Sequence, residues 1–295
     1  MDEITKIETV DQYDQLFGLE TLHPLVNVID FSKATKSVEY IRMNIGFYCL
    51  FLKDAKCGRK IYDYQEGTVV CMAPGQVSGI DNRNRTAPRT KSIGVLFHPD
   101  LIRGTSLGQN IKNYTFFSYE VNEALHLSDQ EREIVTDCIH KIRLELEHTI
   151  DKHSKQLIVR NIELLLDYCM RFYERQFITR NQANKDIVVK FEQLLDEYFQ
   201  NQVAMTEGLP SVKYFADKAC LSPNYFGDLI KKETGKTAQE YIQCRIIELA
   251  KERILEGVQT VSQVAYELGF QYPQHFSRLF KKHVGCTPNE YKQKN

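Results

Sequence analysis

Two stretches of the chain, 50 residues apart, carry the same kinds of polar and basic side chain. Each ends in a lysine pair, Lys231-Lys232 in the first and Lys281-Lys282 in the second. Amide, phenol, imidazole, hydroxyl and guanidinium groups precede these pairs: Asn224, Tyr225, Gln274, His275, Ser277 and Arg278. Amides and guanidinium groups can hydrogen-bond to base edges, whereas lysines suit phosphates. The pattern therefore predicts contacts with double-stranded DNA.

The position of each side chain within its stretch predicts a role. Base contacts are expected near the start of each stretch, and backbone contacts from the lysine pairs. The residues expected at bases are Asn224, Tyr225, Gln274 and Arg278. His275 is equally consistent with an exposed histidine and with a DNA contact. The first stretch has Asp228 where the second has Arg278, and an aspartate is repelled by phosphates. The first stretch is therefore expected to bind DNA weakly or to bind a protein surface.

An internal repeat explains how these stretches are positioned. Val212–Tyr241 aligns with Val261–Tyr291, first at an offset of 49 residues and then, after one inserted residue, at 50. Each copy starts with a short apolar helical face, turns, and resumes with a proline, Pro223 or Pro273, at the start of a second helix. Gly269 supplies the turn of the second copy, because glycine tolerates positive φ. The order of elements predicts two helix-turn-helix motifs.

A single helix is expected to join the two motifs. It spans Thr237–Leu255 and opens with a capping box between Thr237 and Glu240. Its apolar stripe is Ile242, Ile246, Leu249 and Ala250. About 18 residues span roughly 27 Å at 1.5 Å per residue, which is close to one DNA turn of about 34 Å. The motifs are therefore expected to enter adjacent major grooves on one face of the DNA.

Residues 187–295 resemble the DNA-binding domain of the AraC/XylS family of bacterial transcriptional regulators. The resemblance is carried by Val264–Phe270, His275–Lys282 and Gly285–Tyr291, with Arg245 and Ala250 on the joining helix. Family members commonly carry a basic residue at the position of Asp228, so this chain departs from the pattern there. The resemblance implies a regulator that binds operator DNA as a homodimer. Its N-terminal cupin-like domain would bind a small-molecule effector, and RNA polymerase is a further expected partner.

The first 177 residues are predicted to form a sensor and dimerisation domain, which makes the whole chain α+β. Residues 20–117 alternate β-branched and aromatic runs with glycines, which favours a small β-barrel. Residues 118–177 switch to a helical period after a capping box at Ser128–Glu131, which predicts an αα-hairpin. The two apolar stripes of the hairpin are Val135, Cys138, Ile139, Ile142 and Leu146, and then Ile158, Ile162, Leu165, Cys169, Phe172 and Tyr173. They are expected to pack on the barrel, on a partner subunit, or on both. Residues 178–186 lack periodicity and are predicted to be a linker to the all-α domain of 187–295.

Four aromatic residues are candidates for a ligand pocket in the N-terminal domain: Tyr48, Phe51, Tyr62 and Tyr64. Aromatic side chains on strands more often belong to the core, so the rival interpretation is a ligand-independent regulator whose N-terminal half binds a protein. Only His23 and His98 fall in the barrel region, and no H-x-H or HEXXH spacing occurs. No catalytic residue, metal site or cofactor is therefore expected, and the chain is not predicted to be an enzyme.

The composition is that of a cytoplasmic globular protein whose charge is unevenly distributed. The 295 residues carry a net charge of −1, and the eight cysteines include no C-x-x-C pair. The first residues lack the basic and apolar regions of a signal peptide, and no apolar run reaches the length of a membrane span. Residues 209–295 hold 13 Lys and Arg against 9 Asp and Glu, or +4, which leaves −5 for the remainder. This distribution excludes a uniformly basic DNA binder and fits a site-specific one.

Overall fold

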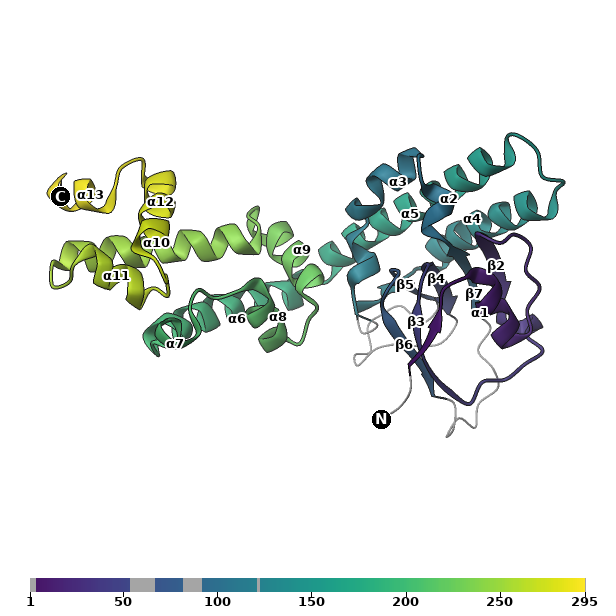
Figure 1. Ribbon diagram of the computed structural model, residues 1–295, viewed down its shortest axis with the longest axis horizontal. Coiled ribbons are helices and arrows are strands. Elements are labelled where there is room, and N and C mark those ends of the chain that lie inside the picture. The colour runs from purple at the N-terminus through teal and green to yellow at the C-terminus, as the bar shows by residue number, and fades with distance from the viewer. Residues whose placement is uncertain (1–3, 54–66, 82–91, 121–122, 295) are drawn as a thin grey trace. The chain divides into compact units, whose positions relative to one another are not determined.

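The computed structural model describes residues 4–53, 67–81, 92–120 and 123–294 (Figure 1). It divides into two compact units, Met1–Thr179 and Arg180–Asn295. The segment 178–186 is helical rather than an irregular linker, because α5 (Ser154–Thr179) ends and α6 (Asn181–Gln200) begins on either side of Arg180. Near the start of α6, a polar contact rather than an apolar stripe accompanies burial. The side chain of Asn184 is buried and donates from Nδ2 to Glu233 Oε1 at 3.3 Å.

The strands of the N-terminal unit form two sheets. A three-stranded sheet has the order β1-β3-β6, with β1 parallel to β3, and a five-stranded antiparallel sheet has the order β2-β7-β4-β5-β8. The strands are β1 (Ile4–Ile7), β2 (Val26–Asp30), β3 (Tyr40–Ile45), β4 (Tyr48–Lys53), β5 (Thr68–Met72), β6 (Val77–Asp81), β7 (Ser92–Phe97) and β8 (Leu125–His126). The predicted α+β class with a β-rich N-terminal region is confirmed. Within the described residues these strands form two sheets rather than one closed barrel.

The main apolar core of this unit is built from both sheets and helix α1 (Val10–Phe17). Met43 and Ile45 of β3 belong to one buried cluster with Cys49 and Phe51 of β4 and Leu96 of β7. A capping box between Thr9 and Gln12 starts α1, whose buried residues Val10, Tyr13 and Phe17 join the same cluster. One face of the five-stranded sheet is therefore committed to this core.

The helical hairpin packs on the five-stranded sheet. It consists of α4 (Asp129–Glu147), which contacts β2, and α5, which contacts β8. The predicted capping box of Ser128 and Glu131 is present, and every residue of the two predicted stripes is buried. Arg175 fastens α5 to both neighbours, since its Nη2 donates to His126 O and to Glu131 Oε2, each at 2.7 Å. Packing on the sheets is thus observed, whereas the partner subunit stays a prediction. The connecting elements are η1 (Phe31–Lys33), α2 (Pro99–Ile102), α3 (Ser106–Asn110), η2 (Ile111–Asn113) and η3 (Thr115–Ser118).

The C-terminal unit is all-helical and is built around two similar groups of helices. After α6 come α7 (Val203–Glu207), α8 (Val212–Ala219), α9 (Pro223–Thr234), α10 (Ala238–Glu256), α11 (Val261–Glu267), α12 (Pro273–Val284) and α13 (Pro288–Lys294). Helix α6 packs on α8 and α9, and α10 packs on α11 and α12. The joining helix predicted over Thr237–Leu255 is α10, and its capping box is present. None of the described helices of the chain is long and apolar enough to cross a membrane.

Candidate nucleic-acid interface

The second helices of the two motifs have equal length and similar starts. α9 and α12 each contain 12 residues and begin with a proline. Ser222 caps α9, because its hydroxyl accepts a hydrogen bond from the backbone N–H of Tyr225 at 3.2 Å. Tyr272 stands at the N-cap position of α12 and makes no capping hydrogen bond with its side chain. The internal repeat therefore corresponds to two helix-turn-helix motifs, the first formed by α8 and α9 and the second by α11 and α12.

An aromatic core holds the inward side of each helix. In the first motif the Phe226 ring meets the Phe191 ring of α6 edge-on, with centroids 5.3 Å apart. In the second motif Phe276 and Phe280 are fully buried, with ring centroids 5.7 Å apart. These contacts fix the rotation of each helix, so its opposite face must point outward.

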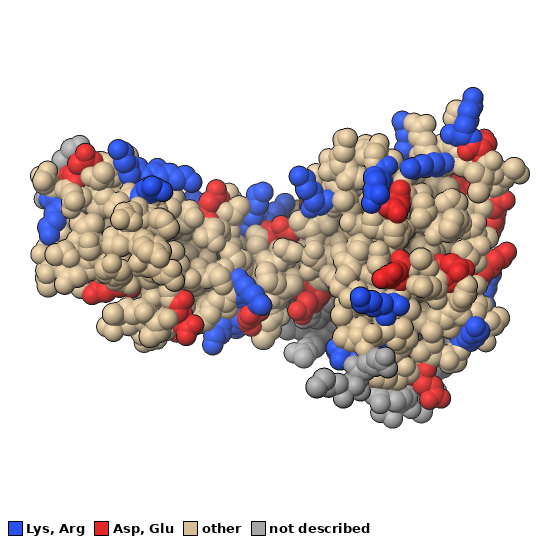
Figure 2. All heavy atoms as spheres, in the orientation of Figure 1, with Lys and Arg blue, Asp and Glu red and all other residues tan. Residues whose placement is uncertain are grey.

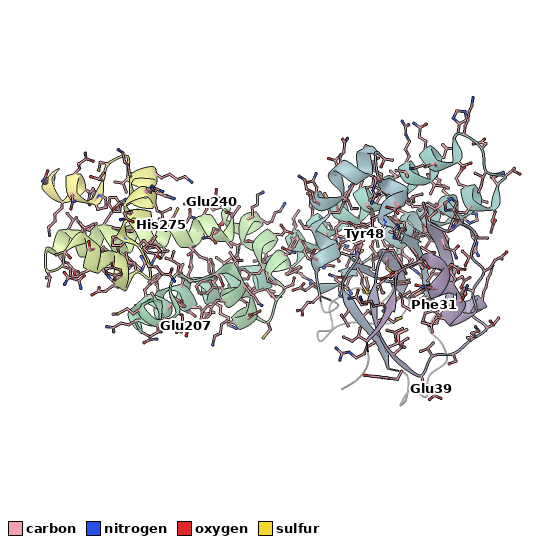
Figure 3. All side chains as sticks on the ribbon, in the orientation of Figure 1. Phe31, Glu39, Tyr48, Glu207, Glu240 and His275 are labelled. Atoms are coloured by element: carbon pink, nitrogen blue, oxygen red, sulfur yellow. The ribbon has the colours of Figure 1, made fainter. Side chains whose placement is uncertain are left out.

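Most of the side chains predicted to touch DNA lie on these outward faces. The exposed ones are Asn224, Lys231, Lys232, Gln274, His275, Arg278, Lys281 and Lys282. Figure 2 shows Lys and Arg atoms gathered over the part of the C-terminal unit where Figure 1 places α12. His275 points away from the helical core (Figure 3). Ser277 is only half-buried, but its hydroxyl donates to Pro273 O at 3.0 Å and is thus used within the helix.

Tyr225 is not on the outward face, which corrects the prediction of a base contact. Its side chain is 4% exposed, and its hydroxyl lies 3.5 Å from Nη1 of Arg180 at the start of α6. The equivalent residue of the second motif is His275, which is exposed and lies beside the Tyr272 ring at 5.5 Å. The two motifs therefore share a backbone plan and differ in which first-turn side chains they expose.

Lysines of α9 and α12, the second helices of the two motifs and from here on called the recognition helices, lower the pKa of one carboxyl group, that of Glu240. Glu240 closes the capping box of α10 and accepts a hydrogen bond from the Thr237 N–H at 2.9 Å (Figure 3). The pKa of Glu240 is lowered, first by this backbone hydrogen bond and by that of the Thr237 hydroxyl, and further by the charges of Lys231 and Lys282. One lysine of each predicted phosphate-binding pair therefore favours the charged form of Glu240, by less than the hydrogen bonds of Thr237 do.

Helix α10 is tied to both motifs by polar contacts. On one side, Arg245 Nε lies 2.8 Å from Asp196 Oδ1 of α6, the helix that packs on the first motif. Towards the second motif, Arg253 Nη1 lies 3.2 Å from Glu267 Oε2 of α11. Its 19 residues span about 28 Å at 1.5 Å per residue. Helix α10 therefore connects the two motifs, and its length is close to one turn of DNA, about 34 Å.

Two exposed tyrosines near α12 were not among the predicted contacts. Tyr272 is 56% exposed at the N-cap of α12, and Tyr266 of α11 is 53% exposed. Tyr272 directly precedes Pro273, so its position at the start of α12 could have been inferred from the proline. Tyr266 follows the buried pair Val264 and Ala265 on a short helix and carries no comparable signal.

The candidate ligand residues of the N-terminal unit do not share a pocket. Phe51 belongs to the core between the sheets, whereas Tyr48 stacks on Phe97, with ring centroids 5.0 Å apart, on the other face of β4. Alternating side chains of a strand point to opposite faces, so residues three apart cannot line one cavity from the same face. Tyr62 and Tyr64 lie outside the described residues.

A cavity occurs elsewhere in the same unit. It has a volume of about 300 Å³ and is lined mainly by residues from the end of α1, from β2 and from α4. The lining residues are Gly18, Leu19, Glu20, Leu22, Val28, Ile29, Asp30, Lys33, Arg143 and Glu147. The part of the chain that the structure describes contains no group of three His, Cys, Asp or Glu side chains arranged to hold a metal ion.

Known proteins resemble the C-terminal unit, and some matches extend over most of the chain, such as the probable transcriptional regulator LumQ of Photobacterium leiognathi, which is 22% identical over 77% of this chain and 82% of LumQ. Residues 215–294 match a helix-turn-helix domain family. The transcriptional regulatory protein YesN of Bacillus subtilis is 37% identical over 87 residues, which are 28% of this chain and 24% of YesN. The transposon Tn10 TetD protein of Escherichia coli is 31% identical over 145 residues, which are 49% of this chain and 91% of TetD. A solved transcriptional regulator of Chromobacterium violaceum, described as having an AraC-type DNA-binding domain, is 21% identical, with a TM-score of 0.27 over 28% of this chain and 75% of that one. The chain thus spans about a quarter of YesN and most of TetD.

Proposed function

This chain belongs to the AraC/XylS family of transcriptional regulators, and we propose that it binds operator DNA sequence-specifically by placing α9 and α12 in adjacent major grooves. The observation that carries the proposal is the pair of 12-residue helices, each with exposed polar side chains in its first turn and an exposed lysine pair near its end. First-turn side chains of a recognition helix meet base edges, and its far end meets the backbone.

The two helices contribute unequally in this proposal. On α12, Gln274 and Arg278 address base edges, and His275 stands beside them as a further donor. On α9, Asn224 is the exposed first-turn amide, because Tyr225 is buried. Lys231-Lys232 and Lys281-Lys282 bind phosphates. Asp228 lowers the affinity of α9 for DNA, and the outward face of α9 suits a protein partner such as RNA polymerase.

Selection from a random DNA library tests this function. The full chain is incubated with duplexes containing about 30 randomised base pairs, and bound DNA is amplified over several rounds at physiological salt, because affinity depends steeply on salt. A two-part motif whose halves lie one helical turn apart is the expected product. Recovery of unrelated sequences from both the protein and a no-protein control would contradict sequence-specific binding.

The outer side of the hairpin supports a homodimer. On α5, Leu157, Asn161, Leu164 and Tyr168 follow one another at the alternating spacing of a coiled-coil seam. Leu157 and Leu164 are 43% and 41% exposed, although both are large apolar side chains. A second copy of the chain would bury this seam, and a dimer would double the operator contacts.

A small-molecule effector in the N-terminal unit completes the proposal. The cavity of about 300 Å³ is at the lower end of the range for ligand sites, roughly 300–1,000 Å³. Its lining combines apolar side chains with Lys33, two acidic residues and the ion pair of Arg143 with Glu147, and these polar groups can orient a polar ligand. The alternative is a regulator in the cytoplasm whose N-terminal half binds a protein, and the placement of Tyr48 and Phe51 on opposite faces of β4 favours it.

Thermal unfolding of the full chain separates these two versions. Fractionated metabolite pools are added one at a time, and a bound ligand raises the Tm by mass action. A reproducible rise with one fraction supports the effector. Unchanged Tm values across all fractions support the protein-binding alternative.

A further inference from the structure

The turns of the two motifs have the same hydrogen bonds but different residues at the critical position. In the first motif, Cys220 N–H donates to Asp217 O at 3.1 Å, and in the second, Gly269 N–H donates to Tyr266 O at 3.0 Å. Cys220 has a φ of +57° and Gly269 a φ of +90°. The first motif thus forms this turn with an exposed cysteine in the left-handed region. A left-handed turn alone does not explain why the second motif has glycine.

Close backbone contact supplies the additional reason for a glycine at 269. A Cβ atom at this position would lie 2.7 Å from the carbonyl carbon and oxygen of Gly208, and 3.0 Å from the carbonyl oxygen of Ala204. These are backbone atoms at the end of α7, so no side-chain rotation can relieve the overlap. Helix α7 lies beside α11, and Gly269 is buried in the contact (Figure 1).

The other side of this contact is anchored in the first motif. Gly208 O accepts a hydrogen bond from the Tyr198 hydroxyl at 3.0 Å. Tyr198 belongs to α6, is 3% exposed, and meets the Tyr214 ring of α8 edge-on at 5.1 Å. A continuous path of packed groups therefore runs from the core of the first motif, through Tyr198 and Gly208, to the turn of the second motif.

Together with α10, this path forms a closed frame of three contacts between helices. Asp196 of α6 pairs with Arg245 of α10, and Arg253 of α10 pairs with Glu267 of α11. The contact of Gly208 with Gly269 forms the third side. Packed interiors are nearly incompressible, so a displacement at one side of such a frame is passed on to the elements that it supports. Gly269 precedes Pro273, the first residue of α12, by four positions.

We propose that α7 is a brace that fixes the spacing and angle between the two recognition helices through the contact of Gly208 with Gly269. The inference rests on the proposed binding of two adjacent grooves. DNA offers its grooves at fixed intervals, so a brace of this kind makes the protein selective for one half-site spacing. Gly269, Gly208 and Tyr198 are positioning residues, since they lie in the frame and not on the outward faces of α9 and α12.

Three variants of the full chain test the brace: Gly269→Ala, Tyr198→Phe, and Cys220→Ala as the matched control at the equivalent turn. Each is titrated with the selected two-part DNA, with the same DNA after randomisation of either half, and with the same DNA carrying one extra base pair between the halves. Hydrogen exchange of residues 203–208 is measured on each variant as a readout that does not depend on DNA.

Gly269→Ala is expected to lose about tenfold in affinity for the two-part site, since linked sites gain roughly 10²–10⁴ when geometry lets both engage. Its affinity for each half-site stays within about twofold of the original, and its preference for the natural spacing falls. Tyr198→Phe shows the same trend more weakly. Cys220→Ala leaves all four affinities unchanged, and hydrogen exchange in α7 rises only in Gly269→Ala and Tyr198→Phe.

Two results would overturn the brace. One is a uniform loss of affinity for both half-sites and both spacings in Gly269→Ala, which would mean that Gly269 only supports the fold of the second motif. The other is an exchange rate in α7 that is the same in Gly269→Ala and Cys220→Ala. If the original chain selects no two-part DNA, the proposed function fails, and the exchange comparison alone then decides whether the brace exists.

Discussion

Asp228 and Arg278 stand at equivalent positions of the two recognition helices and carry opposite charges. Arg278 is exposed on α12, and a guanidinium group there can bond a guanine or a phosphate. Arg278→Ala is expected to abolish detectable binding in a gel-shift assay on the selected DNA. Asp228→Ala is expected to bind as well as the original chain or better, because it removes a negative charge from a helix that is proposed to bind phosphates. Equal losses in the two variants would contradict this division of roles.

Tyr225 and His275 form a second pair of equivalent residues, one buried and one exposed. Tyr225→Ala is expected to lower the free energy of unfolding by about 3–5 kcal/mol, the cost of removing a large aromatic side chain from a core. His275→Ala is expected to change it by less than about 0.5 kcal/mol, as at an ordinary surface position, and to affect only DNA binding. Urea unfolding of both variants measures the difference. A stable Tyr225→Ala would place the ring outside the core.

Asp14 makes the stability of the N-terminal unit depend on pH. Burial raises the pKa of its carboxyl to about 6, although hydrogen bonds from Thr21 and Asn27 act to lower it. Between its ordinary pKa of 3.8 and about 6, the folded chain holds a proton that the unfolded chain has lost. The contribution of Asp14 to the free energy of unfolding therefore falls as pH rises through this window and is constant above it.

The variant Asp14→Asn isolates this contribution. The free energy of unfolding is measured at half-unit steps from pH 4 to pH 7 for the original chain and for the variant. The difference between the two chains is expected to move in favour of Asp14→Asn as the pH rises, and to level off above about pH 6. A difference that is flat across the whole range would show that Asp14 titrates normally in the folded chain.

At the scale of helices and strands, sequence patterns predicted the features that depend on interactions between residues close together in the chain. The capping box of Thr237 and Glu240 placed the start of α10 correctly, and its predicted end at Leu255 is one residue short. Helix α6 begins in a segment without apolar periodicity, where burial depends on polar contacts such as that of Asn184 with Glu233, so it could not be predicted from a stripe. The hydrogen bond between the Tyr225 hydroxyl and Arg180, which precedes that helix, could not be predicted for the same reason.

The arrangement of the strands in two sheets also could not be predicted from the sequence patterns. Strand β1 pairs in parallel with β3, and Ile4 is opposite Arg42, a pairing between distant segments that no turn signal announces. The predicted barrel region began only at residue 20. Alternation of apolar residues predicts that a strand has a buried face, but it does not identify the neighbouring strand. The placement of Tyr48 and Phe51 in one pocket failed for a related reason, because their spacing of three puts them on opposite faces.

The seam on α5 leads to a prediction about assembly. Leu157→Asp combined with Leu164→Asp places charges at two exposed seam positions and is expected to convert a dimer into a monomer. Sedimentation velocity at several protein concentrations measures the change, and circular dichroism checks that the helices remain. The matched control is Leu255→Asp, an exposed leucine at the end of α10 that lies outside the seam. A double variant that still sediments as a dimer would exclude this seam as the interface.

At the scale of the whole molecule, the charge distribution suits a protein that binds specific DNA sites. Residues 209–295 carry a net charge of +4, and the remainder of the chain carries −5. Because phosphate contacts supply most non-specific affinity, this modest positive charge keeps that affinity low. Helix α12 carries three Lys and Arg residues and no acidic one, whereas the two lysines of α9 are balanced by Asp228 and Glu233. Sequence selection must then come from the simultaneous fit of α9 and α12, which the frame of α6, α7 and α10 supports.

Hydroxyl-radical footprinting of the full chain on its selected DNA shows how many grooves one chain occupies, and so tests whether α9 and α12 bind adjacent grooves. Two protected patches per bound chain are expected, on one face of the duplex and about 10 base pairs apart. Arg278→Ala should remove the patch belonging to α12 first. A single patch one groove wide, or protection without any sequence preference, would contradict the account.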